Sequence, residues 1–155
     1  MKKFFQHTAY FIAYGIWWLL SLLPFWALYL LSDGLYLLMS HVVRYRHRVI
    51  WHNLRTSFPE KSEDELRQIE KNFYKWFCDY IVETVKLITM SKEQLLKRMT
   101  FTGVEKLNQY AAEGRSVGVY LGHLGNWEWI TSLPYWTQNA TCCQLYHPLE
   151  NEYFD

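Results

Sequence analysis

The stretch Ser116-Val-Gly-Val-Tyr-Leu-Gly-His-Leu-Gly-Asn-Trp-Glu128 decides the fold that we expect. Its first six residues are small or apolar and carry no charge, which is typical of a buried β-strand. Gly122 and Gly125 then permit a tight turn around His123. Asn126 is a favourable N-cap for a helix that follows. A strand, a glycine-flanked turn and a helix start together predict an α/β fold, in which reactive groups lie at the carboxyl ends of strands.

The same segment predicts a general base. His123 and Glu128 lie five positions apart, and an imidazole titrates close enough to neutrality to take the proton of a hydroxyl group. Glu128 would fix the ring tautomer and balance the imidazolium charge, and backbone N–H groups from Gly125 through Asn126 to Trp127 would stabilise an oxyanion. A thioester donor requires no nucleophilic residue. We therefore predict acyl transfer, with His123 and Glu128 as catalytic residues and Gly125 and Asn126 as substrate-binding residues.

The spacing of this pair is not specific by itself. His147 also has an acidic residue, Glu152, five positions later. A structural alternative is that His123 is a turn histidine with satisfied hydrogen bonds, and that Glu128 is a first-turn acid that favours the helix dipole. The two glycines and the strand-like residues before them favour the catalytic interpretation.

Residues 1–43 are predicted to form a membrane anchor. Asp33 is the only formally charged residue between residues 3 and 44. The run from Tyr10 to Leu31 has the roughly 20 residues needed to cross a hydrocarbon core, and its tryptophans and tyrosines suit the membrane interfaces. A cleaved signal peptide is the competing interpretation, but the run is too long for one and lacks an Ala-x-Ala-like site.

The topology of this anchor has two alternatives. Pro24 and the pair Asp33-Gly34 interrupt the apolar run, which predicts either a span followed by an interfacial helix or a hairpin. The arginines that follow the run outnumber the two lysines before it. This asymmetry favours the cytoplasmic side of the membrane for everything after residue 43.

The segment from His41 to Arg55 is predicted to be an amphipathic helix that lies along the membrane. Its apolar stripe contains Val43, Ile50 and Leu54. A neighbouring stripe contains Arg44, Arg48 and Arg55, which we predict to be substrate-binding residues for lipid phosphates or for the acidic surface of a partner. The alternative is a solvated basic face with no specific partner. A net charge of +1 argues against a nucleic-acid partner.

Three helices are expected after this segment. Ser62 with Glu65 three residues later predicts a capping box at the start of a long helix, whose apolar face continues to about Thr89. Ser91 is the expected cap of a short helix, and a further helix is expected over Val104–Glu113.

Residues 44–155 are accordingly predicted to form the first part of an α/β domain, with an incomplete sheet flanked by helices. Brief strands are expected at Phe101–Gly103 and Ala140–Tyr146. The three cysteines have no zinc-binding spacing, and we expect neither a metal nor a cofactor.

Three segments resemble the bacterial lipid A biosynthesis acyltransferases, the lauroyl and myristoyl transferase family within the wider lysophospholipid acyltransferase group. Residues 114–128 resemble the catalytic segment, whose signature is His, four residues, and then Asp or Glu. Residues 48–60, Arg-Val-Ile-Trp-His-Asn-Leu-Arg-Thr-Ser-Phe-Pro-Glu, are similar to the arginine, Asn-Leu and Phe-Pro-Glu segment. Tyr146-His-Pro-Leu-Glu-Asn151 resembles the strand and loop that follow the catalytic helix. The resemblance covers nearly the whole chain.

This resemblance implies that His123 and Glu128 are the catalytic pair. It also implies an acyl-carrier-protein thioester as donor and a lipid A precursor as acceptor, at the cytoplasmic face of the bacterial inner membrane. Members of the family are considerably longer, so the chain resembles their N-terminal half and is expected to be a truncated domain. The alternatives are a lysophospholipid or glycolipid acceptor, an inactive membrane module, and hydrolysis of a thioester by the same pair.

Overall fold

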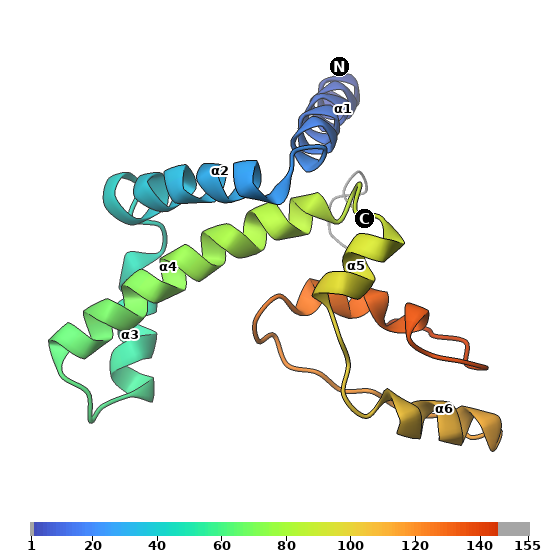
Figure 1. The fold of residues 1–155 in the computed structure, drawn as a ribbon. Coiled ribbons are helices and arrows are strands. Elements are labelled where there is room, and N and C mark those ends of the chain that lie inside the picture. The colour runs from blue at the N-terminus through green and yellow to red at the C-terminus, as the bar shows by residue number, and fades with distance from the viewer. Residues whose placement is uncertain (1, 146–155) are drawn as a thin grey trace. The chain divides into compact units, whose positions relative to one another are not determined.

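The computed structural model describes residues 2–145, with the backbone alone for residues 2–5. These residues form six α-helices, one π-helical turn and one 3₁₀ helix (Figure 1). The chain divides into two compact units. One comprises residues 23–86, and the other comprises the described residues of 1–22 and 87–155.

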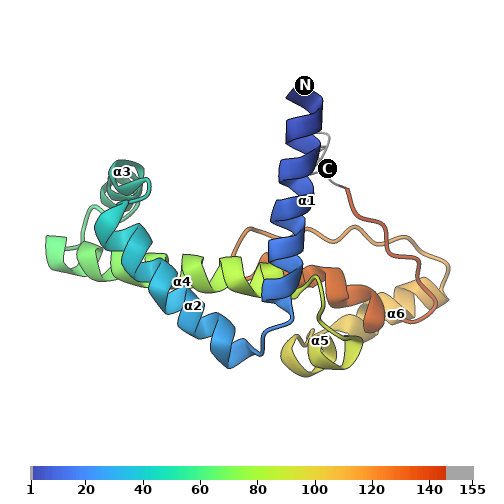
Figure 2. The ribbon, with the colours of Figure 1, turned by 90° about the horizontal axis from the view of Figure 1, so that it is seen from above.

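In the unit of residues 23–86, α2 (Phe25–Leu37) packs against α4 (Glu63–Lys86) and crosses it obliquely, as Figure 2 shows most clearly. Leu28 of α2 is only 1 % exposed. Beside it, the buried Ser32 Oγ donates a 2.6 Å hydrogen bond to Asp79 Oδ1 of α4. A buried hydroxyl without a partner costs free energy, so this bond helps to fix the register of the two helices.

Two predicted helix starts are confirmed. The Ser62 N–H donates to Glu65 Oε2 over 2.9 Å, and the Glu65 N–H donates to Ser62 Oγ over 3.4 Å, which is the expected capping box of α4. The bond from the Ser62 backbone, and then the one from its hydroxyl, hold the pKa of Glu65 below its ordinary value. Ser91 caps α5 (Lys92–Arg98) in a second box, with Gln94.

The predicted single helix from His41 to Arg55 is wrong. A π-helical turn, η1 (Leu38–Val42), extends α2, and α3 (His47–Ser57) begins only after a break. Within the break, Arg44 and Arg46 have φ angles of +51° and +50°. This left-handed conformation is incompatible with a continuous α-helix, and so the chain changes direction here.

The predicted span from Tyr10 to Leu31 is not one helix. α1 (Lys2–Ser21) ends before Pro24, and Pro24 is the N-cap residue of α2. Proline lacks a backbone N–H group and forces the preceding residue out of the helical region, so it separates the two helices. The interruption predicted at Asp33-Gly34 does not occur, because α2 continues through these two residues. Within residues 2–145, no single helix is both long and apolar enough to cross a membrane. One pair of consecutive helical segments, Phe25–Val42 and His47–Ser57, meets the length and hydropathy criteria when taken together, and the two segments are bent by 87°.

The other unit contains α5, α6 (Val104–Ala112) and η2 (Trp127–Tyr135). α5 packs on η2, and each of the two helices carries a buried apolar side chain, Leu95 on α5 and Trp129 on η2. The Asn108 amide of α6 binds the backbone that follows η2, donating one bond of 3.5 Å and accepting one of 2.6 Å. The expected helix over residues 104–113 is therefore confirmed to within one residue.

The α/β prediction is wrong: residues 2–145 contain no strand and no sheet. Residues 116–121, 101–103 and 140–145 are irregular or turn-like, and Tyr146, the end of the last predicted strand, lies outside the described residues. Val, Tyr and Leu side chains favour an extended backbone, but a strand also needs a neighbour to take its hydrogen bonds, and these segments do not pair with one another. Tyr120 is 97 % exposed, so the segment that was predicted to be a buried strand is not buried.

Candidate functional site

A short exposed turn presents His123. The Leu124 N–H donates to the Gly122 carbonyl over 2.8 Å, which places His123 at the centre of a three-residue turn. Gly125 has a φ of +61°, a conformation that side-chain-bearing residues adopt only with strain. The His123 ring packs edge-on against Trp127, with ring centroids 4.5 Å apart and planes at 73°. The predicted glycine-flanked turn is confirmed, and Trp127 is a neighbour of His123 that the pattern did not specify.

Glu128 lies half-buried in the first turn of η2, which begins directly after Asn126. The helix expected here is thus present as a 3₁₀ helix, and Asn126 precedes it without a side-chain capping bond. The Glu128 carbonyl accepts a 3.0 Å bond from Thr131 Oγ1. Pairing of the Glu128 carboxylate with the His123 ring stays a prediction.

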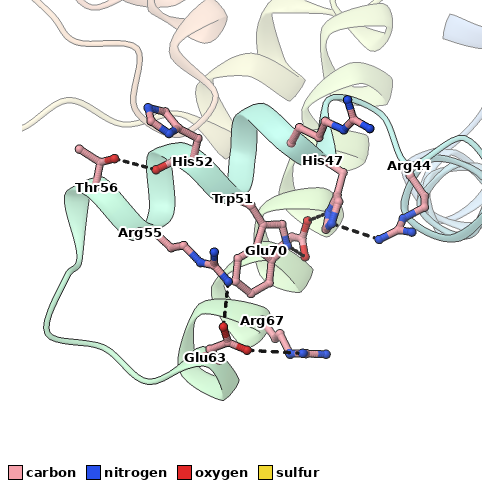
Figure 3. A pocket seen from close by; sticks show the side chains of 10 residues that line it. Arg44, His47, Trp51, His52, Arg55, Thr56, Glu63, Arg67 and Glu70 are labelled. Carbon is pink, nitrogen blue, oxygen red and sulfur yellow. Dashed lines mark hydrogen bonds and ion pairs between the residues drawn. The ribbon is translucent and has the colours of Figure 1, made fainter.

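The unit of residues 23–86 contains a hollow of about 750 Å³ beside α3 and the N-terminal part of α4 (Figure 3). It is rich in cationic and hydrogen-bonding side chains from both helices and from the break before α3. The lining residues are Arg44, His47, Arg48, Trp51, His52, Arg55, Thr56, Glu63, Arg67 and Glu70.

Glu70 organises one side of this hollow. Its carboxylate contacts His47 Nδ1 at 2.5 Å through one oxygen and accepts from Trp51 Nε1 at 2.8 Å through the other. On the opposite edge of the ring, Arg44 Nη2 lies 3.1 Å from His47 Nε2. Because a guanidinium group can only donate, Nε2 accepts, and the ring proton belongs on Nδ1, which donates to Glu70. Arg44, His47 and Glu70 therefore form a chain of hydrogen bonds in which each group orients the next (Figure 3).

Glu63 organises the other side. It pairs with Arg55 at 2.8 Å and with Arg67 at 3.7 Å, and the Arg55 guanidinium lies over the Trp51 ring at 5.1 Å from its centroid. These ion pairs are exposed and contribute about 0–1 kcal/mol each, so they orient side chains more than they stabilise the fold. Arg48 lines the hollow and makes no ion pair with any residue of the described range.

The break before α3 is tied to α4. The Tyr74 hydroxyl donates a 2.7 Å bond to the Tyr45 carbonyl, which lies between the two left-handed arginines. Burial, and then the negative charge of Glu70, raise the pKa of Tyr74, so this hydroxyl keeps its proton and remains a donor.

The structure brings together all three predicted substrate-binding arginines, Arg44, Arg48 and Arg55, in the hollow beside α3 and α4. Sequence reasoning missed Arg67 and Glu70, which come from α4 and reach the hollow only through helix packing. Glu63, Arg67 and Glu70 are spaced at positions i, i+4 and i+7, which places them on one face of a helix. This spacing could have identified them from the sequence as one polar group. His123, Gly125, Asn126 and Glu128 belong to the other unit. Within residues 2–145, no group of three or more His, Cys, Asp or Glu side chains is arranged to hold a metal ion.

The chain matches the model of a known protein family. No curated protein and no solved structure matches the chain. The family model described as "Bacterial lipid A biosynthesis acyltransferase" matches residues 1–155, which is the whole sequence. The chain therefore belongs to the bacterial lipid A biosynthesis acyltransferase family.

Proposed function

We propose that the chain transfers a fatty acyl group from an acyl-carrier-protein thioester to a hydroxyl group of a lipid A precursor. Membership of the family over residues 1–155 carries this proposal, because it supplies the reaction class and the lipid A type of acceptor. The exposed turn that presents His123 supplies a base in a position that a lipid hydroxyl can reach.

The proposed chemistry is general-base acyl transfer. His123 takes the proton of the acceptor hydroxyl as the oxygen attacks the thioester carbonyl, and Glu128 orients the ring and compensates its positive charge. N–H groups at the start of η2, around Gly125 and Asn126, stabilise the tetrahedral oxyanion. The carbon–sulfur bond then breaks, and the imidazolium returns the proton to the leaving thiolate. An ester and a free thiol are the products.

We further propose that the protein works at the cytoplasmic face of the inner membrane. Large apolar side chains are exposed on both units, which supports contact with lipid. On α1 they include Phe11, Ile12, Ile16 and Leu19, and on α2 they include Trp26, Leu30 and Leu37. Arg44, Arg48 and Arg55 are proposed to bind an anionic group of the substrate or partner.

The test compares lipid A from cells with and without the gene for this chain, by mass spectrometry. We expect one secondary acyl chain to be lost without the gene and restored by the wild-type gene. A His123→Ala variant should lower the rate of transfer about 10²–10⁴-fold and fail to restore that chain.

His147→Ala is the matched control, because His147 has the same spacing to an acid but no glycine on either side of it in the sequence. It should restore the acyl chain at wild-type levels. Full restoration by His123→Ala, at equal protein abundance, would show that His123 is not the base. Release of free fatty acid in place of ester would show that the chain is a hydrolase.

A further inference from the structure

We propose that the hollow between α3 and α4 binds the phosphate monoester of a lipid headgroup. This inference rests on the proposed membrane association, and it does not depend on the chemistry assigned to His123. Of the two partners considered for Arg44, Arg48 and Arg55, lipid phosphates and an acidic protein surface, we propose the lipid phosphates.

The charge of the hollow favours an anion. Four arginines line it against two glutamates, and no carboxylate of the described residues pairs with Arg48. Guanidinium groups match phosphate oxygens in geometry and bind them through two parallel hydrogen bonds. Arg48 therefore supplies a cation that needs a counterion from outside the chain.

Two of the arginines around it, Arg44 and Arg55, already have partners within the chain. His47, itself oriented by Glu70, accepts from Arg44, and the Glu70 side chain is only 13 % exposed. Arg55 is fixed between the Trp51 ring and Glu63. Side chains that are already ordered lose less conformational entropy on binding, which favours a built site over a mobile basic face.

The size of the hollow favours a headgroup over a protein. A volume of about 750 Å³ falls within the range of small-molecule sites. Glu63 is paired with Arg55 and Arg67, so the cationic groups of the hollow that lack an ion pair within the described residues are those of Arg44 and Arg48.

The course of the chain is compatible with a hollow at the level of the lipid phosphates. Exposed apolar residues lead directly into it: Leu37, Leu38, Val42 and Val43 precede Arg44. The helical segment before the break and α3 after it meet at 87°. If the apolar segment enters the hydrocarbon, a helix at nearly a right angle to it lies in the plane of the headgroups.

The experiment measures partition of the full chain into two kinds of vesicle. One contains phosphatidylcholine with phosphatidic acid, and the other contains phosphatidylcholine with oleic acid, adjusted to the same surface potential. The first offers a phosphate monoester and the second only a carboxylate, so a general attraction of positive charge to the membrane contributes equally to both.

Arg48→Gln should lower partition into the phosphatidic acid vesicles about tenfold more than into the oleic acid vesicles. Arg44→Gln should do the same, which guards against a defect peculiar to one variant. Arg46→Gln is the matched control, because Arg46 is exposed and lies in the same break but does not line the hollow. It should lower the two partitions equally.

Equal losses for Arg48→Gln and Arg46→Gln on both vesicles would overturn the proposal and leave a nonspecific basic face. Glucose 1-phosphate added in solution should compete only weakly. Tight binding of it without vesicles, with vesicle partition unaffected by Arg48→Gln, would assign the site to a free phosphate compound. Loss of carrier-protein binding alone in Arg48→Gln would assign it to a protein partner. His123→Ala should leave every partition unchanged, so a wrong base assignment and a wrong phosphate site give different results.

Discussion

The arginine hollow and the His123 turn are built in different ways. In the hollow, side chains from two packed helices hold one another through Glu63 and Glu70. At the turn, His123 is exposed, and its position follows from a few backbone angles and from the ring of Trp127. Packing thus positions the groups proposed to bind, whereas local backbone geometry positions the group proposed to react. The two regions should therefore respond differently to substitution.

The largest effect is expected at the turn. Glu128→Gln should keep the fold and lower acyl transfer about 10²–10⁴-fold, because an amide cannot balance the imidazolium charge. The measurement is incorporation of labelled acyl groups into lipid A by membranes that contain the variant. Glu113→Gln is the control, since Glu113 is at the end of α6 and pairs with Arg115. Normal transfer by Glu128→Gln would mean that this residue is only a first-turn acid.

A smaller effect, on stability alone, is expected in the packed region. Leu28→Ala should lower the free energy of unfolding by about 2–5 kcal/mol, because it opens a cavity between α2 and α4. Leu30→Ala, two residues along the same helix and 63 % exposed, should change it by less than about 0.5 kcal/mol. Denaturant unfolding followed by helical circular dichroism measures both. Equal effects would contradict the assigned packing of α2.

The smallest effect is expected from a substitution that tests one backbone angle, the φ of Gly125. Gly125→Ala should lower the free energy of unfolding by about 1–2 kcal/mol, because a residue with a Cβ adopts the Gly125 φ of +61° only with strain. No atom lies within 4 Å of the added Cβ, so a steric clash does not contribute. Gly122→Ala, in equally open space without a positive φ, is the control and should be nearly neutral. Gly125→Asn should recover part of the loss, because asparagine tolerates the left-handed region. Equal costs at both glycines would show that the turn does not depend on Gly125.

The sequence predicted several features that depend on nearby residues, although not the helix break at Arg44 and Arg46, and it failed where distant segments must meet. The capping box at Ser62, the cap at Ser91 and the turn at His123 are set within a few positions, and all three were predicted. The strand at residues 116–121 was not, because apolar composition describes one segment, whereas a sheet needs several. For the candidate site, three of the four arginines in the hollow were predicted from one helical stripe. Arg67 was missed because helix packing alone brings it there.

The left-handed backbone conformation at Arg44 has a consequence for ligand binding in the hollow. Arginine is a poor choice for a positive φ, and each such residue costs about 1–2 kcal/mol. An anion that contacts Arg44 only in this conformation would stabilise it relative to the other conformations of the chain. Under the proposal of an anion site, occupancy of the hollow would therefore stabilise the left-handed conformation at Arg44 and, with it, the observed path of the chain between α2 and α3.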